Sequence, residues 1–244
     1  MKKVILALAV VVLLVPVAAL ADGTPTTTQT AQLDGTSATD YLVGDSRDNV
    51  INGNDGNDQL FGNAGNDTID GGSGHDLSNG GAGHDVLQGG SGNDILIGGA
   101  GNDTMTGGSG ADVFAWTLAD HGAAGVPAVD AIADFDFAAP TAGGDVLDLR
   151  DLLQGEQNAV SLDRYLEFDT TSQPGNTVIH VSSAGGFAAG AGWSGAQAGA
   201  EDQTIVLQGV ADIRTALSLD ASATDNQVIQ QLIQQGKLLV DHQP

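Results

Sequence analysis

Between residues 44 and 115, apolar residues recur along the chain with a period of nine. In units of nine that begin at Gly44, the eighth position is apolar in seven of eight units, with Ser78 as the exception. The apolar residues at this position are Ile51, Leu60, Ile69, Leu87, Leu96, Met105 and Phe114. A fixed period of this kind predicts a repeat architecture, in which one unit cannot fold alone and each unit stacks on its neighbours.

The polar positions of the repeat are as regular as the apolar ones. Glycine stands at the fourth position and aspartate at the sixth in the same seven units, and the aspartates are Asp58, Asp67, Asp76, Asp85, Asp94, Asp103 and Asp112. The first six residues of a unit suit a tight turn, because glycine tolerates positive φ and lets backbone carbonyls face inward. The last three suit a short strand with the eighth side chain in the core. We predict coils of 18 residues, two units each, that stack as parallel strands.

Stacked coils place each aspartate beside the aspartate 18 residues later, which creates a ladder of like charges. The narrow core does not offset the entropy lost in ordering so many glycines, so we expect the fold to need a counter-ion. Paired carboxylates and free turn carbonyls form an all-oxygen ligand set, which suits calcium better than magnesium. The ladder predicts about five Ca²⁺ ions, between the pairs Asp58–Asp76, Asp67–Asp85, Asp76–Asp94, Asp85–Asp103 and Asp94–Asp112.

The units resemble the nonapeptide G-G-x-G-x-D-x-U-x of the repeats-in-toxin (RTX) proteins, a calcium-binding β-roll repeat. The resemblance covers residues 44–115 and is weakest at the start, where Asn54 and Asn63 replace the second glycine. The first unit has Arg47 for glycine and Asn49 for aspartate, which weakens a site between Asn49 and Asp67 and suits that unit to a capping role.

After residue 115 the period stops and ordinary domain sequence begins. Segments 129–137, 145–149, 165–168, 176–183 and 203–210 are β-branched or alternating and predict short strands. Residues 225–236 predict a helix, with Asp225 as N-cap and Gly236 as C-cap. The predicted fold is therefore all-β: a parallel β-roll over residues 44–115, then a mostly β C-terminal domain over residues 116–244 with one or two short helices.

The order of these segments resembles the C-terminal target domain of RTX proteins that leave the cell by type I secretion, over residues 107–241. The resemblance implies export through an ABC transporter, followed by folding in extracellular calcium. It also implies that Asp130 and Asp134 complete a calcium site at the last coil. Ordinary acidic residues at a strand edge are an equal alternative for this pair.

The first 21 residues are typical of an export signal, with Lys2 and Lys3 before an apolar run and a small-residue cleavage site ending at Ala21. An uncleaved membrane anchor is the alternative, because the run of about 17 apolar residues is at the lower limit of a membrane span. Residues 22–43 predict a polar linker. A cleaved N-terminal signal and a C-terminal secretion address are not normally combined, so the export route stays open between them.

Composition narrows the partners. With 31 acidic and seven basic residues, the chain has a formal net charge of −24, which argues against nucleic acid as a partner. Cysteine is lacking, which excludes disulfides and thiolate chemistry. The expected protein is a secreted monomer in the extracellular space, at the cell surface or in the periplasm, with no stable membrane insertion once the signal is removed.

Motifs for catalysis are not found, so we expect no enzyme activity. There is no H-E-x-x-H, and G-W-S-G-A around Ser194 departs from the nucleophile motif G-x-S-x-G. His75 and His84 occupy the fifth position of adjacent units, which predicts solvent-facing residues on opposite sides of the roll rather than transition-metal ligands. A fragment or small relative of a surface adhesin, acting in attachment, is the alternative to a calcium-binding secreted protein.

Overall fold

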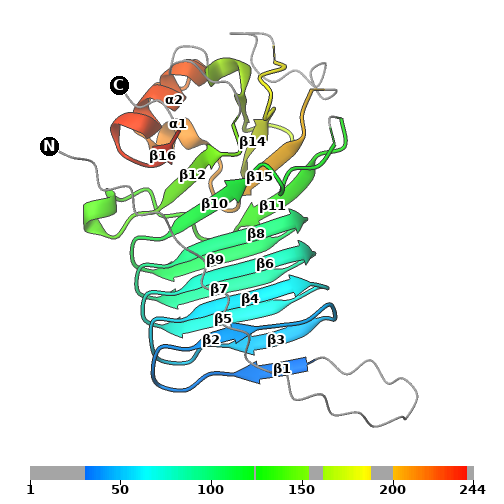
Figure 1. The fold of residues 1–244 in the computed structure, drawn as a ribbon. Helices are drawn as coiled ribbons and strands as arrows, with labels where there is room; N and C mark the ends of the chain where they lie inside the picture. The colour runs from blue at the N-terminus through cyan, green and yellow to red at the C-terminus, as the bar shows by residue number, and fades with distance from the viewer. Residues whose placement is uncertain (1–30, 124, 154–161, 188–199, 241–244) are drawn as a thin grey trace, which may run out of the picture.

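A computed structural model describes residues 31–123, 125–153, 162–187 and 200–240, in which two β-sheets form a roll with a mixed domain at one end (Figure 1). The first sheet contains, in spatial order, β1 (Ala31–Asp34), β3 (Asn49–Asn52), β5 (Thr68–Ser73), β7 (Val86–Ser91), β9 (Thr104–Ser109), β11 (Ala128–Ile132), β15 (Gln203–Leu207), β14 (Thr177–Val181) and β13 (Leu166–Asp169). The second contains β16 (Leu238–Leu239), β12 (Val146–Asp151), β10 (Val113–Thr117), β8 (Ile95–Gly101), β6 (Leu77–Gly83), β4 (Gln59–Ala64) and β2 (Tyr41–Val43).

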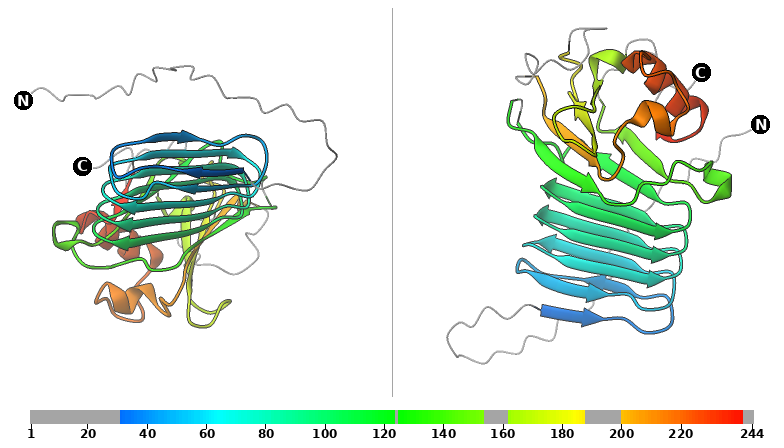
Figure 2. Two further views of the ribbon diagram at one scale, coloured as in Figure 1. Left: turned by 90° about the horizontal axis from the view of Figure 1, so that it is seen from below. Right: turned by 180° about the vertical axis from the view of Figure 1, so that it is seen from behind.

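The chain alternates between the two sheets, so that successive coils stack as parallel strands (Figure 2). Thr68 of β5 is paired with Val86 of β7, and Val86 with Thr104 of β9, at the same offset of 18 residues. This register confirms the predicted coil of two units. The strands are longer than predicted, because the turn glycines also join the ladder, as Gly72 does with Gly90.

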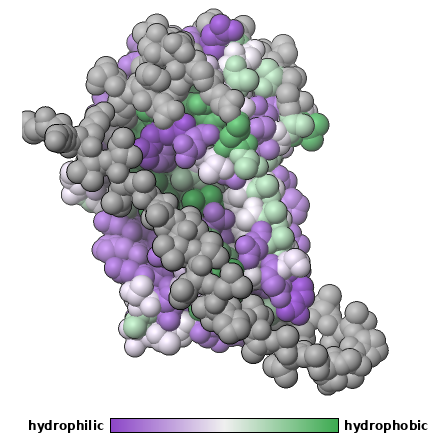
Figure 3. Space-filling view, viewed as in Figure 1, coloured by the Kyte–Doolittle hydropathy of each residue, from purple (hydrophilic) through white to green (hydrophobic). Residues whose placement is uncertain are grey.

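The core of the roll is one line of side chains from each sheet. All seven apolar residues at the eighth position are completely buried, as predicted. Their strand neighbours point outward, and the two outer faces differ in character. The second sheet exposes apolar residues such as Tyr41 and Ile95, whereas the first exposes Thr68 and Gln88. Hydrophilic residues also gather along the edge of the roll at the left of the space-filling view (Figure 3).

Close approach of successive coils explains the second glycine of the unit. Gly90 has a φ of +107°, and a Cβ atom there would lie 2.1 Å from the carbonyl oxygen of Gly72. Asn54 and Asn63 hold the same left-handed conformation with φ of 74° and 75°. Their side-chain amides donate to the carbonyl of Gly35 at 3.0 Å and of Gly44 at 2.7 Å, which secures these two turns without glycine.

The roll begins earlier than predicted, and the linker prediction is wrong for residues 31–43. Strands β1 and β2 pair in parallel with β3 and β4. Gly35, Asp40 and Leu42 occupy the first, sixth and eighth positions of a further unit, which lacks the second and fourth glycines that would reveal it. The predicted signal, residues 1–21, lies outside the described residues, as does the rest of the segment up to residue 30.

The sheets also continue past residue 115. Strand β11 pairs with β9, and β12 pairs with β10, so that Ile132 adjoins Met105 and Leu147 adjoins Phe114. The loss of the nine-residue spacing therefore marks longer connections rather than the end of the two sheets. Beyond β15 the first sheet becomes antiparallel, through β14 and β13.

Two helices and two single turns of 3-10 helix complete the C-terminal domain, which confirms the predicted fold class. They are α1 (Ile213–Ala216), α2 (Asp225–Gln234), η1 (Pro140–Ala142) and η2 (Leu162–Arg164). The N-cap of α2 is Thr224 rather than the predicted Asp225, because Thr224 and Gln227 form a reciprocal capping box. Gly236, with a φ of 70°, follows the helix as expected.

Ser78 provides a test of the core. It is 1% exposed between Leu60 and Leu96, and its hydroxyl has no hydrogen-bond partner. Ser78→Val removes this hydroxyl and adds apolar contact, so we expect stabilisation of about 1 kcal/mol or more by chemical denaturation. Ser91→Val, at an exposed position, is the control and should change stability little. A destabilised Ser78→Val protein would show that the core has no room at this coil.

Candidate metal centre

The aspartates at the sixth position form two buried rows along the roll. Each lies where a turn enters a strand, and each is at most 3% exposed. The first row contains Asp58, Asp76, Asp94 and Asp112, and the second row contains Asp67, Asp85 and Asp103.

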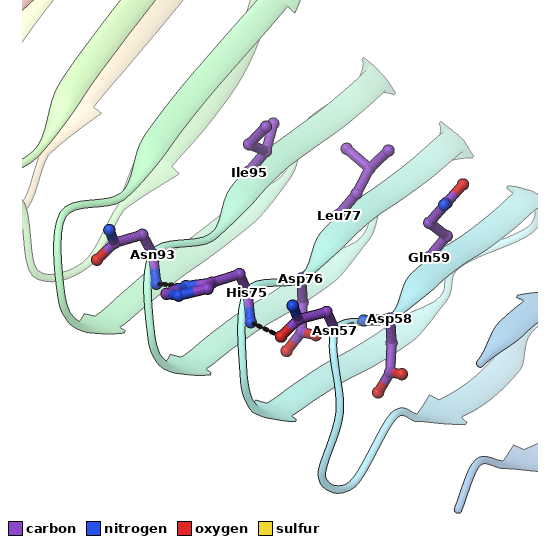
Figure 4. A pocket seen from close by; sticks show the side chains of 8 residues that line it. All are labelled: Asn57, Asp58, Gln59, His75, Asp76, Leu77, Asn93 and Ile95. Atoms are coloured by element: carbon purple, nitrogen blue, oxygen red, sulfur yellow. Dashed lines mark hydrogen bonds between the residues drawn. The ribbon is translucent and has the colours of Figure 1, made fainter. Parts of the chain in front are cut away.

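Within a row, each coil is hydrogen-bonded to the carboxylate of the next. The backbone amide of Asp58 donates to Oδ1 of Asp76 at 2.7 Å, and that of Asp76 donates to Oδ1 of Asp94 at 2.9 Å. The second row repeats the contact, with Asp67 donating to Asp85 at 2.7 Å. Figure 4 shows the carboxylates of Asp58 and Asp76 on successive turns, pointing in the same direction. The rows thus bring together the aspartate pairs that the sequence predicts.

The second oxygen of each carboxylate is left without a partner. Oδ2 is buried and accepts no hydrogen bond in Asp58, Asp67, Asp76, Asp85, Asp94, Asp103 and Asp112. A buried polar atom without a hydrogen bond is costly, and a buried unpaired charge more so. Seven equivalent atoms in this state are the arrangement that a row of bound cations would satisfy.

The space around these oxygens has room for an ion because the first residue of each unit is glycine. A Cβ atom on Gly71 would lie 2.6 Å from Oδ2 of Asp76 and 2.5 Å from the carbonyl oxygen of Gly89 in the next coil. Gly80 repeats the arrangement with Asp85 and Gly98, at 2.3 and 2.5 Å. A carboxylate oxygen and a turn carbonyl therefore border the same space. No three acidic or histidine side chains converge within the described ranges, so backbone carbonyls must supply most ligands, as calcium accepts.

Burial makes these carboxylates hard to ionise without a cation. It raises the pKa of Asp94 to about 6, with the neighbouring Asp112 and Asp76 charges adding to the effect. It raises the pKa of Asp103 to about 7, and Asp130 and Asp85 contribute. Burial likewise raises the pKa of Asp76 and Asp85. A divalent cation would reverse this electrostatic cost by neutralising two carboxylates at once.

The two acids predicted beyond the repeat are placed at the end of the roll. Oδ1 of Asp130 accepts from the amide of Asp103 at 2.9 Å, so Asp130 continues the second row. Both oxygens of Asp134 accept from the backbone amides of Gly107 and Gly108, at 2.9 Å each. Asp134 thus holds the last repeat turn, beside the space that Asp112 borders at Gly107.

The sequence analysis missed Asp145, which continues the first row. Its Oδ1 accepts from the amide of Asp112 at 3.0 Å. The available signal was the triplet of aspartate, any residue and an apolar residue, at 130–132 and 145–147, which repeats positions six to eight of the unit. Asp40 likewise begins the first row, since its amide donates to Oδ1 of Asp58 at 2.8 Å.

His75 and His84 are exposed and lie outside the rows, as predicted. Nδ1 of His75 accepts from the amide of Asn93 at 2.7 Å, and Nδ1 of His84 accepts from the amide of Asn102 at 2.9 Å. The two rings belong to separate ladders of fifth-position residues. His75 also borders a surface pocket that Asp76 and Ile95 line (Figure 4).

A parallel roll of 18-residue coils with two inner rows of carboxylates defines the chain's class, a β-roll built for cations. The family model of the RTX calcium-binding nonapeptide repeat matches in four copies, at residues 34–69, 43–78, 58–87 and 79–114. Residues 34–114 therefore carry RTX repeats, which imply a calcium-binding β-roll. No curated protein matches the chain.

Two similar solved structures are subunits of the mannuronan C5-epimerase of Azotobacter vinelandii. The AlgE6R3 subunit is 23% identical, covers 83% of this chain and 91% of its own, and has a TM-score of 0.31. The AlgE6R2 subunit is 20% identical, covers 88% of this chain and 94% of its own, and has a TM-score of 0.41.

Asp94 tests the rows because it belongs to two of the predicted pairs. Asp94→Asn keeps the shape of the side chain and removes its charge, so we expect calcium affinity to fall at least tenfold by isothermal titration. Asp70→Asn removes an exposed charge from the same roll and should bind like the wild type. Equal losses in the two variants would assign the effect to overall charge rather than to the row.

The raised pKa values also predict how the calcium-free roll responds to pH. An aspartate whose pKa rises from 3.8 to about 7 on folding, as in Asp103, stabilises the folded state fully below 3.8. This contribution is lost as the pH rises to about 7. In chelator, far-UV circular dichroism should therefore show more β-structure at pH 5 than at pH 8. The difference should shrink in Asp103→Asn, and an unchanged difference would contradict the assignment.

Proposed function

We propose that this protein is a secreted calcium-binding RTX protein whose roll folds when calcium fills the two rows. The observation that carries the proposal is the set of seven buried Oδ2 atoms without hydrogen-bond partners. The ligands are the seven repeat aspartates together with turn carbonyls, and about five ions occupy the five pairs.

The electrostatics of the rows support folding that depends on calcium. Without an ion, the roll must bury carboxylates one above another, and a protein of net charge −24 opposes its own compaction. With calcium, the cost of burying each carboxylate is offset by bonds to the ion. Weak sites suffice, because extracellular calcium-binding modules operate at dissociation constants of about 10⁻⁴–10⁻³ M. The chain is then unfolded where calcium is scarce and folded where it is plentiful.

The same property suits an exported protein. We assign residues 116–244 to a domain that caps the roll and carries the address for type I secretion machinery. The continuation of both sheets from β9 and β10 into β11 and β12 supports the capping role. Residues 1–21 are proposed as a signal peptide, and the location as extracellular. Among the described residues, no helix is long and apolar enough to cross a membrane.

We further assign the protein a binding function rather than a catalytic one. The repeat carboxylates that could act as acids or bases are held within the two rows, where each binds the backbone of the preceding coil. The large negative charge favours a monomer, since it opposes association between copies.

Far-UV circular dichroism of the full chain tests the proposal. In chelator the roll should show little β-structure, and millimolar calcium should restore it in a cooperative transition. Magnesium at the same concentration is the control, and should fail because it prefers a compact octahedral shell that retains water. A chain that is equally β-rich in chelator and in calcium would overturn calcium-dependent folding.

A further inference from the structure

The ends of the two rows differ from their interiors. Inside the rows, each aspartate has one oxygen bonded to the previous coil and one without a hydrogen bond. At the C-terminal ends, Asp130 and Asp145 have both oxygens bonded. This contrast separates positions that need a cation from positions that the protein satisfies itself.

At the end of the second row, two side-chain donors converge on Asp130. Its Oδ2 accepts from Nε1 of Trp116 at 2.7 Å and from Nε2 of Gln203 at 2.8 Å. Trp116 follows the last repeat on β10, and Gln203 begins β15, far along the chain. All three side chains are at most 1% exposed. The donors take up the oxygen that faces a cation in the other members of the row.

At the end of the first row, Asp145 is satisfied by backbone. Its Oδ2 accepts from the amide of Asp136 at 2.8 Å, in addition to the amide of Asp112 on Oδ1. The loop that contains Asp136 replaces the turn of a repeat unit, and its carbonyls need a partner of their own.

Lys237 supplies that partner. Its side chain is 1% exposed, although lysine is rarely buried. The ammonium group donates to the carbonyl oxygen of Ala138 and, at 3.5 Å, to that of Asp136. It also lies 5.7 Å from the ring centre of Phe137, close enough for a cation–π contact.

The charge of Lys237 is thus placed among inward-facing carbonyls at the end of a carboxylate row. Burial lowers the pKa of Lys237, while the Asp136 and Asp145 charges raise it. An ion bound in the repeats would meet the same two groups, a turn carbonyl and a carboxylate. The ammonium differs only in being attached to the chain.

We propose that the C-terminal domain closes both rows with its own donors, with Lys237 in place of an ion in the first row and Trp116 with Gln203 in the second. Calcium sites then stop at Asp112 and Asp103, and Asp130 and Asp145 are end stops rather than calcium ligands. This inference rests on the proposed calcium-binding function. It has two consequences: the sites are confined to the interior pairs, and the end of the roll needs no calcium.

Counting bound ions tests the first consequence. Native mass spectrometry of the full chain at saturating calcium should give the same count for the wild type and Asp130→Asn, and two fewer ions for Asp94→Asn. Loss of one ion in Asp130→Asn would overturn the inference and leave the calcium-binding function intact. A wild type that binds no calcium would instead overturn the proposed function.

Thermal unfolding in chelator tests the second consequence, through the fluorescence of Trp116. Trp193→Phe provides a background with Trp116 as the one tryptophan of the chain. In this background, Lys237→Met should lower the midpoint of the Trp116 transition by about 5 °C or more, and Lys237→Arg should restore most of the loss. Equal midpoints for Lys237 and Lys237→Met, or no Trp116 transition in chelator, would overturn the inference.

Discussion

The architecture depends on one atom repeated seven times, a carboxylate oxygen that the fold buries and the protein leaves unbonded. Everything near it follows from this constraint. The first glycine of each unit leaves space beside it, the turn carbonyl of the next coil faces the same space, and the line of apolar residues keeps water out. The core alone is one side chain wide in each sheet, so the cation completes the interior as well as the charge balance.

The regular part of the fold could be predicted from sequence because position in the unit determines environment. Asp94 and Leu96 occupy equivalent positions in every coil, so period alone placed one in a row and the other in the core. The same reasoning failed where the period is hidden. Residues 31–43 keep Gly35, Asp40 and Leu42 but lack two glycines, and their strands are recognised only through pairing with β3 and β4.

The ends of the rows were beyond sequence reasoning for a different reason. Asp145 is 33 residues from Asp112, and Gln203 is 73 residues from Asp130, so no local spacing relates the partners. These contacts arise from how the C-terminal chain folds back on the roll. Lys237 shows the same limit: in sequence it is a polar residue after a helix, and only the tertiary fold buries it beneath the loop of Asp136.

The 18-residue register has a consequence for how such a roll can change length. Adding or removing two units keeps every strand in its own sheet. A change of one unit would move all coils on the N-terminal side into the opposite sheet, so that Tyr41 and Phe61 would join the face that now carries Thr68 and Gln88. Because the C-terminal domain holds the last two units in fixed places, the protein can grow or shrink without altering its faces only in whole turns, like a spiral staircase whose top landing is fixed.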